Sequence, residues 1–137
     1  MNKISLIILL FISLITISCT DSKVELRKEI NAGIKDNLNS NFEGALVHFN
    51  NALSIDPNNA EAYLNLGNTY FNQQKYDLSM ENANKAVELD NTFGQAYKLR
   101  AELYKKIFDD KDKACENYLL AEKYGVENLY NYTKFCK

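Results

Sequence analysis

Residues 61–71, EAYLNLGNTYF, decide how this chain folds. Tyrosine and leucine side chains recur there at helical spacing, which predicts a helix with one buried face. Gly67 lies in the middle of that pattern, although a glycine in a helix interior costs roughly 1 kcal/mol relative to alanine. A glycine at this position indicates that a second helix packs closely against the first, because protein interiors are close-packed and only a missing side chain leaves room for such an approach.

The same arrangement recurs along the chain. Gly33 and Gly67 are 34 residues apart, as are Ala52 and Ala86. A third copy at residues 94–125 fits if the turn between its two helices has one extra residue. Small residues at these positions predict three helical hairpins that stack, with the alanines giving the next hairpin room to dock.

The period of 34 residues and the core Tyr63–x2–Leu66–Gly67–x2–Tyr70 resemble the tetratricopeptide repeat family. The resemblance implies an all-α fold, a short right-handed superhelical solenoid of three helix-turn-helix repeats at about residues 26–59, 60–93 and 94–125. It also implies that Gly67 faces Ser79 on the second helix of its hairpin. In the first repeat, the pattern Ser40–x–x–Glu43 indicates a capping box at the start of the second helix.

The segment after Gly125 is amphipathic, and we expect it to form a capping helix over about residues 126–136, because a solenoid must cover its exposed terminal face. Cys115 lies ten residues before Gly125 and Cys136 eleven after it, so the two cysteines should stand at similar height in an antiparallel hairpin. In an exported protein this geometry predicts a Cys115–Cys136 disulfide. The alternative is a pair of buried thiols that pack as small apolar residues.

The N-terminus has one lysine and then a nearly continuous apolar run of about 14 residues, too short for a comfortable membrane span of roughly 20. This pattern predicts a signal peptide at residues 1–18. Cys19 follows directly, and the segment resembles a bacterial lipoprotein signal, in which that cysteine is acylated. Residues 19–22 would then be a short tether and residues 23–137 the repeat domain, lipid-anchored in a bacterial cell envelope, periplasmic or surface-facing. An uncleaved anchor helix and ordinary signal cleavage are the alternatives.

Composition argues against several classes of function. The 137 residues have a net charge of −2, with both signs interspersed, so nothing indicates a nucleic-acid partner. The one histidine, His48, has no cysteine near it in the predicted stack, and no CxxC or cluster with ligand spacing indicates a metal site. We therefore expect no enzyme, no metal and no cofactor.

Binding is the remaining class, and the family resemblance implies a concave face, lined by the first helix of each repeat, that holds a protein or peptide. The residues that the resemblance places on this face are Ile34, Leu38, Leu64, Asn65, Asn68, Phe71, Asn72, Lys98, Glu102 and Lys105. In the first repeat the helix could instead be rotated, so that Ile30 and Ile34 enter the core.

Chaperone-docking members of the family clamp a terminal carboxylate with lysine, asparagine and arginine side chains. The matching positions here are Ile30, Ile34, Asn65, Gln95 and Leu99, so only the asparagine is kept and no carboxylate clamp is predicted. The sequence thus predicts a membrane-tethered adaptor for a protein or peptide partner in envelope assembly or secretion. The alternative is a purely structural or self-associating repeat module, a possible homo-oligomer.

Overall fold

The computed structural model describes residues 3–134 and residue 136, with side chains from residue 21 onward. In that part the chain forms helices and no strand. The helices are α1 (Lys3–Leu38), α2 (Phe42–Ile55), α3 (Ala60–Asn72), α4 (Tyr76–Leu89), α5 (Gly94–Lys106), α6 (Lys111–Lys123) and α7 (Tyr130–Thr133).

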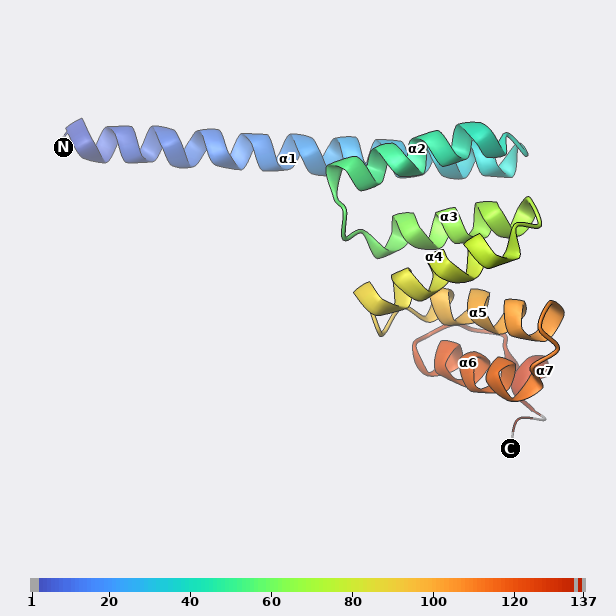
Figure 1. Cartoon of the computed structure of the whole chain (residues 1–137). Coiled ribbons are helices and arrows are strands. Elements are labelled where there is room, and N and C mark those ends of the chain that lie inside the picture. Colours follow the sequence, from blue (N-terminus) through green and yellow to red (C-terminus); the bar gives the residue numbers. More distant parts are fainter. Residues whose placement is uncertain (1–2, 135, 137) are drawn as a thin grey trace.

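The helices pair as three antiparallel hairpins, α1–α2, α3–α4 and α5–α6, which stack in sequence order, and α7 lies at the end of the stack beside α6 (Figure 1). Each hairpin packs on the next through α2 against α3 and α4 against α5. Successive first helices also meet, α1 with α3 and α3 with α5. The predicted all-α solenoid of three repeats is confirmed.

Gly67 lies where α3 crosses α4. The hydroxyl of Ser79 on α4 donates a buried hydrogen bond to the carbonyl oxygen of Gly67 (2.8 Å). A Cβ atom at Gly67 would lie 3.3 Å from the carbonyl oxygen of Ser79. The predicted contact between these two residues is confirmed, and it accounts for a glycine inside the helix.

In the first hairpin, the space beside the corresponding glycine, Gly33, is filled in a different way. The ring of Phe49 on α2 occupies the space beside Gly33, where a Cβ atom would be 2.5 Å from the nearest ring carbon. Phe49 is fully buried and shares a core cluster with Ala45 and Leu66. The glycine of this repeat therefore accommodates a large aromatic side chain instead of a small one.

The helix starts differ from the predicted capping box. Ser40 has a left-handed backbone with φ +60°, and Asn41 is the N-cap residue, whose side chain accepts a hydrogen bond from the amide of Gly44 (3.3 Å). The capping interpretation of Ser40 was wrong because α2 begins at Phe42, which makes Asn41 and not Ser40 the residue at the N-cap position. Asp110 caps α6 in the same way, accepting from the amide of Lys113 (3.0 Å).

The third repeat has the longer turn that the alignment required. Residues 107–110 separate α5 from α6, whereas residues 73–75 separate α3 from α4. Asp109 takes a left-handed conformation (φ +47°) in this turn. The insertion is thus confined to the loop and leaves the register of the helices intact.

The C-terminal segment differs from the predicted capping helix over 126–136, because only Tyr130–Thr133 is helical. Asn128 has φ +63°, a conformation that interrupts a helix, and the residues before α7 instead bury Val126 and Leu129 against Tyr97 and Tyr118. The segment still covers the end of the stack, as expected.

Cys115 on α6 and Cys136 beyond α7 form a disulfide, with their Cα atoms 5.4 Å apart. The predicted pairing is confirmed, and the bridge fixes the C-terminal segment to the last hairpin.

The predicted signal peptide at residues 1–18 and the predicted acylation of Cys19 fall outside the residues whose side chains the structure describes. Residues 19–22, predicted as a tether, continue α1 as helix. From residue 21 onward, no helix is long and apolar enough to cross a membrane.

Candidate functional site: a groove along the first helices

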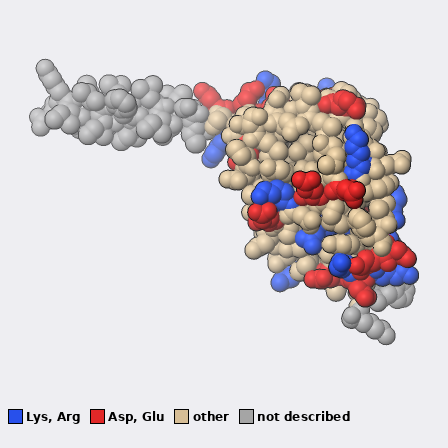
Figure 2. All heavy atoms as spheres, viewed as in Figure 1, with Lys and Arg blue, Asp and Glu red and all other residues tan. Residues whose placement is uncertain are grey.

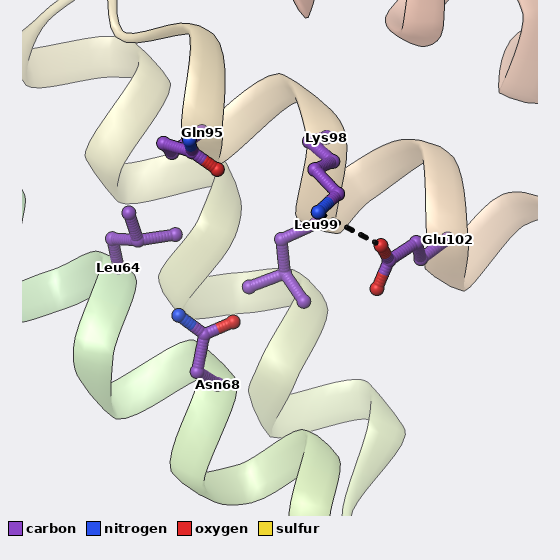
Figure 3. Close-up of a pocket in the computed structure, with 6 residues that line it drawn as sticks. All are labelled: Leu64, Asn68, Gln95, Lys98, Leu99 and Glu102. Atoms are coloured by element: carbon purple, nitrogen blue, oxygen red, sulfur yellow. Dashed lines mark ion pairs between the residues drawn. The ribbon is translucent and has the colours of Figure 1, made fainter. Parts of the chain in front are cut away.

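A hollow of about 340 Å³ lies between α3 and α5. We call it the groove. Figure 3 shows Leu64 and Asn68 on α3 opposite Gln95 and Leu99 on α5. Lys98 and Glu102, one turn apart on α5, complete its wall and form an ion pair at 3.8 Å. The floor is apolar and the rim is polar, an arrangement that suits an extended peptide or a helix of a partner.

Local sequence explains why α3 presents these side chains. The side chains of Asn65 and Thr69 hydrogen-bond the helix's own carbonyls, of Glu61 (2.9 Å) and Asn65 (2.8 Å) respectively. Gly67 and Leu66 face the rest of the stack and are buried. The side chain of Asn68 makes no hydrogen bond within the described part of the chain, so its carboxamide group is available in the groove.

A second hollow of about 380 Å³ follows at the C-terminal end of the groove, with Glu102 shared between the two. We call it the C-terminal hollow. It is formed by α3, α5, α6 and α7, and the residues that line it are Phe71, Glu102, Lys105, Lys106, Tyr118 and Tyr132.

Six of the ten residues predicted for the concave face line these two hollows. Leu64, Asn68, Lys98 and Glu102 line the groove, and Phe71 and Lys105 line the C-terminal hollow together with Glu102. The middle and last repeats are therefore where the structure gathers the predicted binding residues.

The other four predicted residues lie elsewhere. Ile34 packs against the core clusters of Ile30 and Phe49, which favours the rotated-core interpretation of the first repeat. Leu38 is 81% exposed at the end of α1, and Asn65 is engaged with its own helix. Asn72 donates a hydrogen bond to the side chain of Asn37 (3.1 Å). For Ile34 the physical reason is that it follows Ile30 by one helical turn, and Ile30 is fully buried in the core of the first hairpin.

Sequence reasoning missed Tyr118 and Tyr132 in the C-terminal hollow. Their rings stack with centroids 4.8 Å apart. Burial raises the pKa of the Tyr118 hydroxyl to about 12, and the nearby Glu102 carboxylate adds to the shift. If the C-terminal segment had been interpreted as the first helix of a fourth repeat, Tyr132 would have been expected beside α5, where it lines the C-terminal hollow.

His48 belongs to the first hairpin and not to the groove. Its Nδ1 donates to Oε2 of Glu29 (2.8 Å), and its Nε2 lies 3.8 Å from Oδ2 of Asp36. The hydrogen bonds from His48 and Asn51 lower the pKa of Glu29. These contacts tie α1 to α2.

The described side chains form no recognisable catalytic arrangement. Among residues 21–134 and 136, no group of three or more His, Cys, Asp or Glu side chains could hold a metal ion. Cys115 and Cys136 are joined to each other and so offer no thiolate. On the visible face, basic and acidic side chains are mixed, without a large patch of one sign (Figure 2).

Stacked helical hairpins with a groove along their first helices define a helical-repeat solenoid of the protein-interaction type. Two family models match the sequence, one described as a TPR repeat over residues 38–74 and one as a tetratricopeptide repeat over residues 60–93. Residues 38–93 of the chain thus match tetratricopeptide repeat models, and neither matching model is a catalytic family.

The chain is similar to human DnaJ homolog subfamily C member 7, with 35% identity over 92 residues, which are 64% of this chain and 18% of that protein. It is also similar to the STIP1 homolog of Dictyostelium discoideum, with 28% identity over 108 residues, 72% of this chain and 19% of that protein. The chain thus spans less than a fifth of the length of these relatives.

Solved structures agree with the fold. The first TPR domain of Spaghetti (RPAP3), bound to the HSP90 peptide SRMEEVD, superposes with a TM-score of 0.72 at 19% identity and covers 80% of this chain and 88% of its own. The second TPR domain of human RPAP3, in complex with the HSP70 peptide SGPTIEEVD, has a TM-score of 0.66 at 21% identity, covering 82% and 95%. The MamA protein has a TM-score of 0.62 at 28% identity, covering 74% and 55%.

Proposed function

We propose that this protein is a membrane-tethered adaptor that binds a peptide or protein segment in the groove between α3 and α5. The observation that carries the proposal is the groove itself, with an apolar floor at Leu64 and Leu99 and polar groups at Asn68, Lys98 and Glu102. Hydrophobic contacts along the floor would supply affinity, while the polar rim would fix the direction of the bound segment.

The peptide complexes of the two RPAP3 domains support a peptide as the occupant, since those domains share this fold. We do not extend their chaperone peptides to this chain. At the positions that match the carboxylate clamp, Ile30 and Leu99 are 0% and 4% exposed and carry no charge. A partner without a terminal carboxylate at that position is therefore favoured.

Membrane tethering through acylated Cys19 is part of the proposal, and the apolar N-terminal run followed by that cysteine supports it. The setting would be a bacterial cell envelope, in assembly or secretion. Replacing Cys19 by alanine should move the protein from the detergent phase to the aqueous phase in a phase-partitioning assay. Unchanged partitioning would favour an uncleaved anchor helix.

The binding role is tested by site-specific photocrosslinking in the native membrane. A photoreactive residue at Asn68 should give a discrete adduct with another protein, and one at Asn84, an exposed residue of α4 outside the groove, should not. Equal adducts at both positions, or none at Asn68, would contradict the proposal. An adduct at Asn68 with a second copy of this chain would instead support self-association, which analytical ultracentrifugation checks independently.

A further inference from the structure

The C-terminal hollow has a chemistry of its own. Lys105 and Lys106 follow each other at the end of α5, and their ammonium groups lie over different aromatic rings. The Lys105 ammonium is 4.8 Å from the ring centroid of Tyr132, and that of Lys106 is 5.3 Å from that of Phe71. The two cations are thus held at the rim of the hollow by rings on α7 and α3.

These two lysines are not neutralised within the described part of the chain, where no carboxylate oxygen lies within 4 Å of either ammonium group, whereas Glu102 pairs with Lys98 at 3.8 Å. Both lysines are exposed. Positive charge beside a hollow lined by aromatic rings favours an anionic ligand that also carries an apolar or aromatic group.

The wall formed by Tyr132 depends on the C-terminal segment. Tyr132 belongs to a helix of only four residues, too short to be stable without tertiary contacts. It stacks on Tyr118, and the disulfide to Cys115 follows it by four residues, at Cys136. Val126, Leu129 and Thr133 are also buried, and Val126 and Leu129 pack against Tyr97 and Tyr118 of the last hairpin.

We propose that the C-terminal hollow is a separate subsite for an acidic peptide segment with an aromatic side chain, and that the Cys115–Cys136 disulfide completes it. The carboxylates of the segment pair with Lys105 and Lys106, and its aromatic ring packs between Phe71 and Tyr132. This proposal rests on the proposed peptide binding in the groove, because a bound segment reaches the hollow by running along α5 past Glu102.

The dependence on the disulfide makes the subsite sensitive to redox conditions. A dithiol reductant transfers two electrons and two protons to the bridge, which becomes two thiols, while the dithiol becomes a cyclic disulfide. The short α7 then loses its covalent attachment to α6, and Tyr132 leaves the wall. The groove between α3 and α5 contains no residue of α6 or α7 and should keep its shape.

The test uses the full chain in detergent and two synthetic tripeptides, acetyl-Asp-Phe-Glu-amide and its neutral analogue acetyl-Asn-Phe-Gln-amide. Binding is followed by amide chemical shifts in NMR titrations. The acidic peptide should shift the amides of Lys105, Lys106 and Tyr132 and should bind about fivefold or more tightly than the neutral one. Equal affinities, or shifts confined to the groove, would overturn the proposal.

Variants separate the charge from the wall. Lys105→Gln combined with Lys106→Gln should weaken the acidic peptide about fivefold or more. Lys123→Gln is the matched control, because Lys123 also lies over a tyrosine ring but outside the hollow. A loss as large in the Lys123 variant would overturn the argument from position.

Reduction by dithiothreitol should weaken the binding of the acidic peptide about fivefold or more, because its aromatic ring loses the contact with Tyr132, and reoxidation should restore the affinity. Tyr132→Ala, which keeps the bridge, should show the same loss and guards against a general effect of reduction on the fold. Unchanged binding in both the reduced chain and the Tyr132 variant would overturn the role of the wall. If Asn68 gives a crosslink but the acidic peptide binds no more tightly than the neutral one, the subsite is contradicted and the proposed function is kept. If the acidic peptide binds more tightly but Asn68 gives no crosslink, the proposed function of the groove is contradicted.

Discussion

Substitution of Gly67 tests whether close packing between α3 and α4 organises the middle repeat. A Cβ atom there would lie 2.9 Å from Cδ2 of Leu99, 3.3 Å from the carbonyl oxygen of Ser79 and 3.5 Å from the amide nitrogen of Ala83. The methyl group of Leu99 can rotate away, but the backbone of α4 cannot. We therefore expect Gly67→Ala to change the stability little, because a gain in helix propensity of about 1 kcal/mol offsets the tighter contact.

Gly67→Leu should behave differently, since the rest of its side chain would have to push α4 or α5 aside. Overpacking costs about 1–3 kcal/mol, and the gain in helix propensity offsets part of it. We expect a net loss of up to about 2 kcal/mol, which in a domain of this size lowers the melting temperature by up to about 16 °C. Thermal unfolding followed by far-ultraviolet circular dichroism measures the change.

Asn72→Leu is the matched control for Gly67→Leu, because it places the same residue on the same helix at an exposed position. It removes the exposed hydrogen bond to Asn37 and should change the stability by less than about 0.5 kcal/mol. Similar melting temperatures for the two leucine variants would refute the assignment of the buried face of α3.

Three further predictions concern ionisation and the disulfide. The hydrogen bond from His48 lowers the pKa of Glu29 from 4.5, so the stability that this carboxylate provides is complete above that pH and is lost as the pH falls through the lowered value. When the free energy of unfolding is measured in urea at about pH 6 and at about pH 3, it should fall less between the two for Glu29→Gln than for the unmodified chain. Burial raises the pKa of Tyr118 to about 12, so the stability that its neutral hydroxyl provides is intact below about pH 10 and is lost as the pH rises through the raised value. In alkaline unfolding followed by circular dichroism, the Tyr118→Phe variant should therefore lose less stability over that interval than the unmodified chain. Replacing Cys115 and Cys136 by serine should lower the free energy of unfolding by about 3 kcal/mol, because the bridge closes a loop of about 20 residues, and thiol labelling of the denatured, unreduced chain should find neither cysteine free.

Much of the fold could be predicted from the sequence because the small residues at which helices pack recur every 34 residues. The contact between Gly67 and Ser79 depends on hairpin register, which the period sets. The pairing of Cys115 with Cys136 was also predicted, although the antiparallel helix on which that prediction was based forms only over Tyr130–Thr133. The length of the capping helix could not be predicted in the same way. It depends on the left-handed backbone of Asn128, and amphipathic spacing does not report that conformation.

The candidate site was predictable where the repeats are regular and not where they depart from the pattern. Leu64 and Lys98 fall in the groove because α3 and α5 keep the family's orientation. Ile34 does not, because it packs against the core cluster of the fully buried Ile30, and the repeat pattern does not show which side of α1 enters the core. Tyr132 was missed because its place depends on how the C-terminal segment folds back.

Each hairpin packs only on its neighbours in the described part of the chain, and this affects the order in which the molecule folds. Contacts close in sequence need little loop closure, so helices and hairpins of this kind form in microseconds to milliseconds. We expect the hairpins to form one after another as the chain emerges. Formation of the Cys115–Cys136 bridge takes seconds to hours, depending on the oxidant. A newly made molecule should therefore have its groove well before its C-terminal hollow, and the interval between the two is set by the oxidant supply of the compartment.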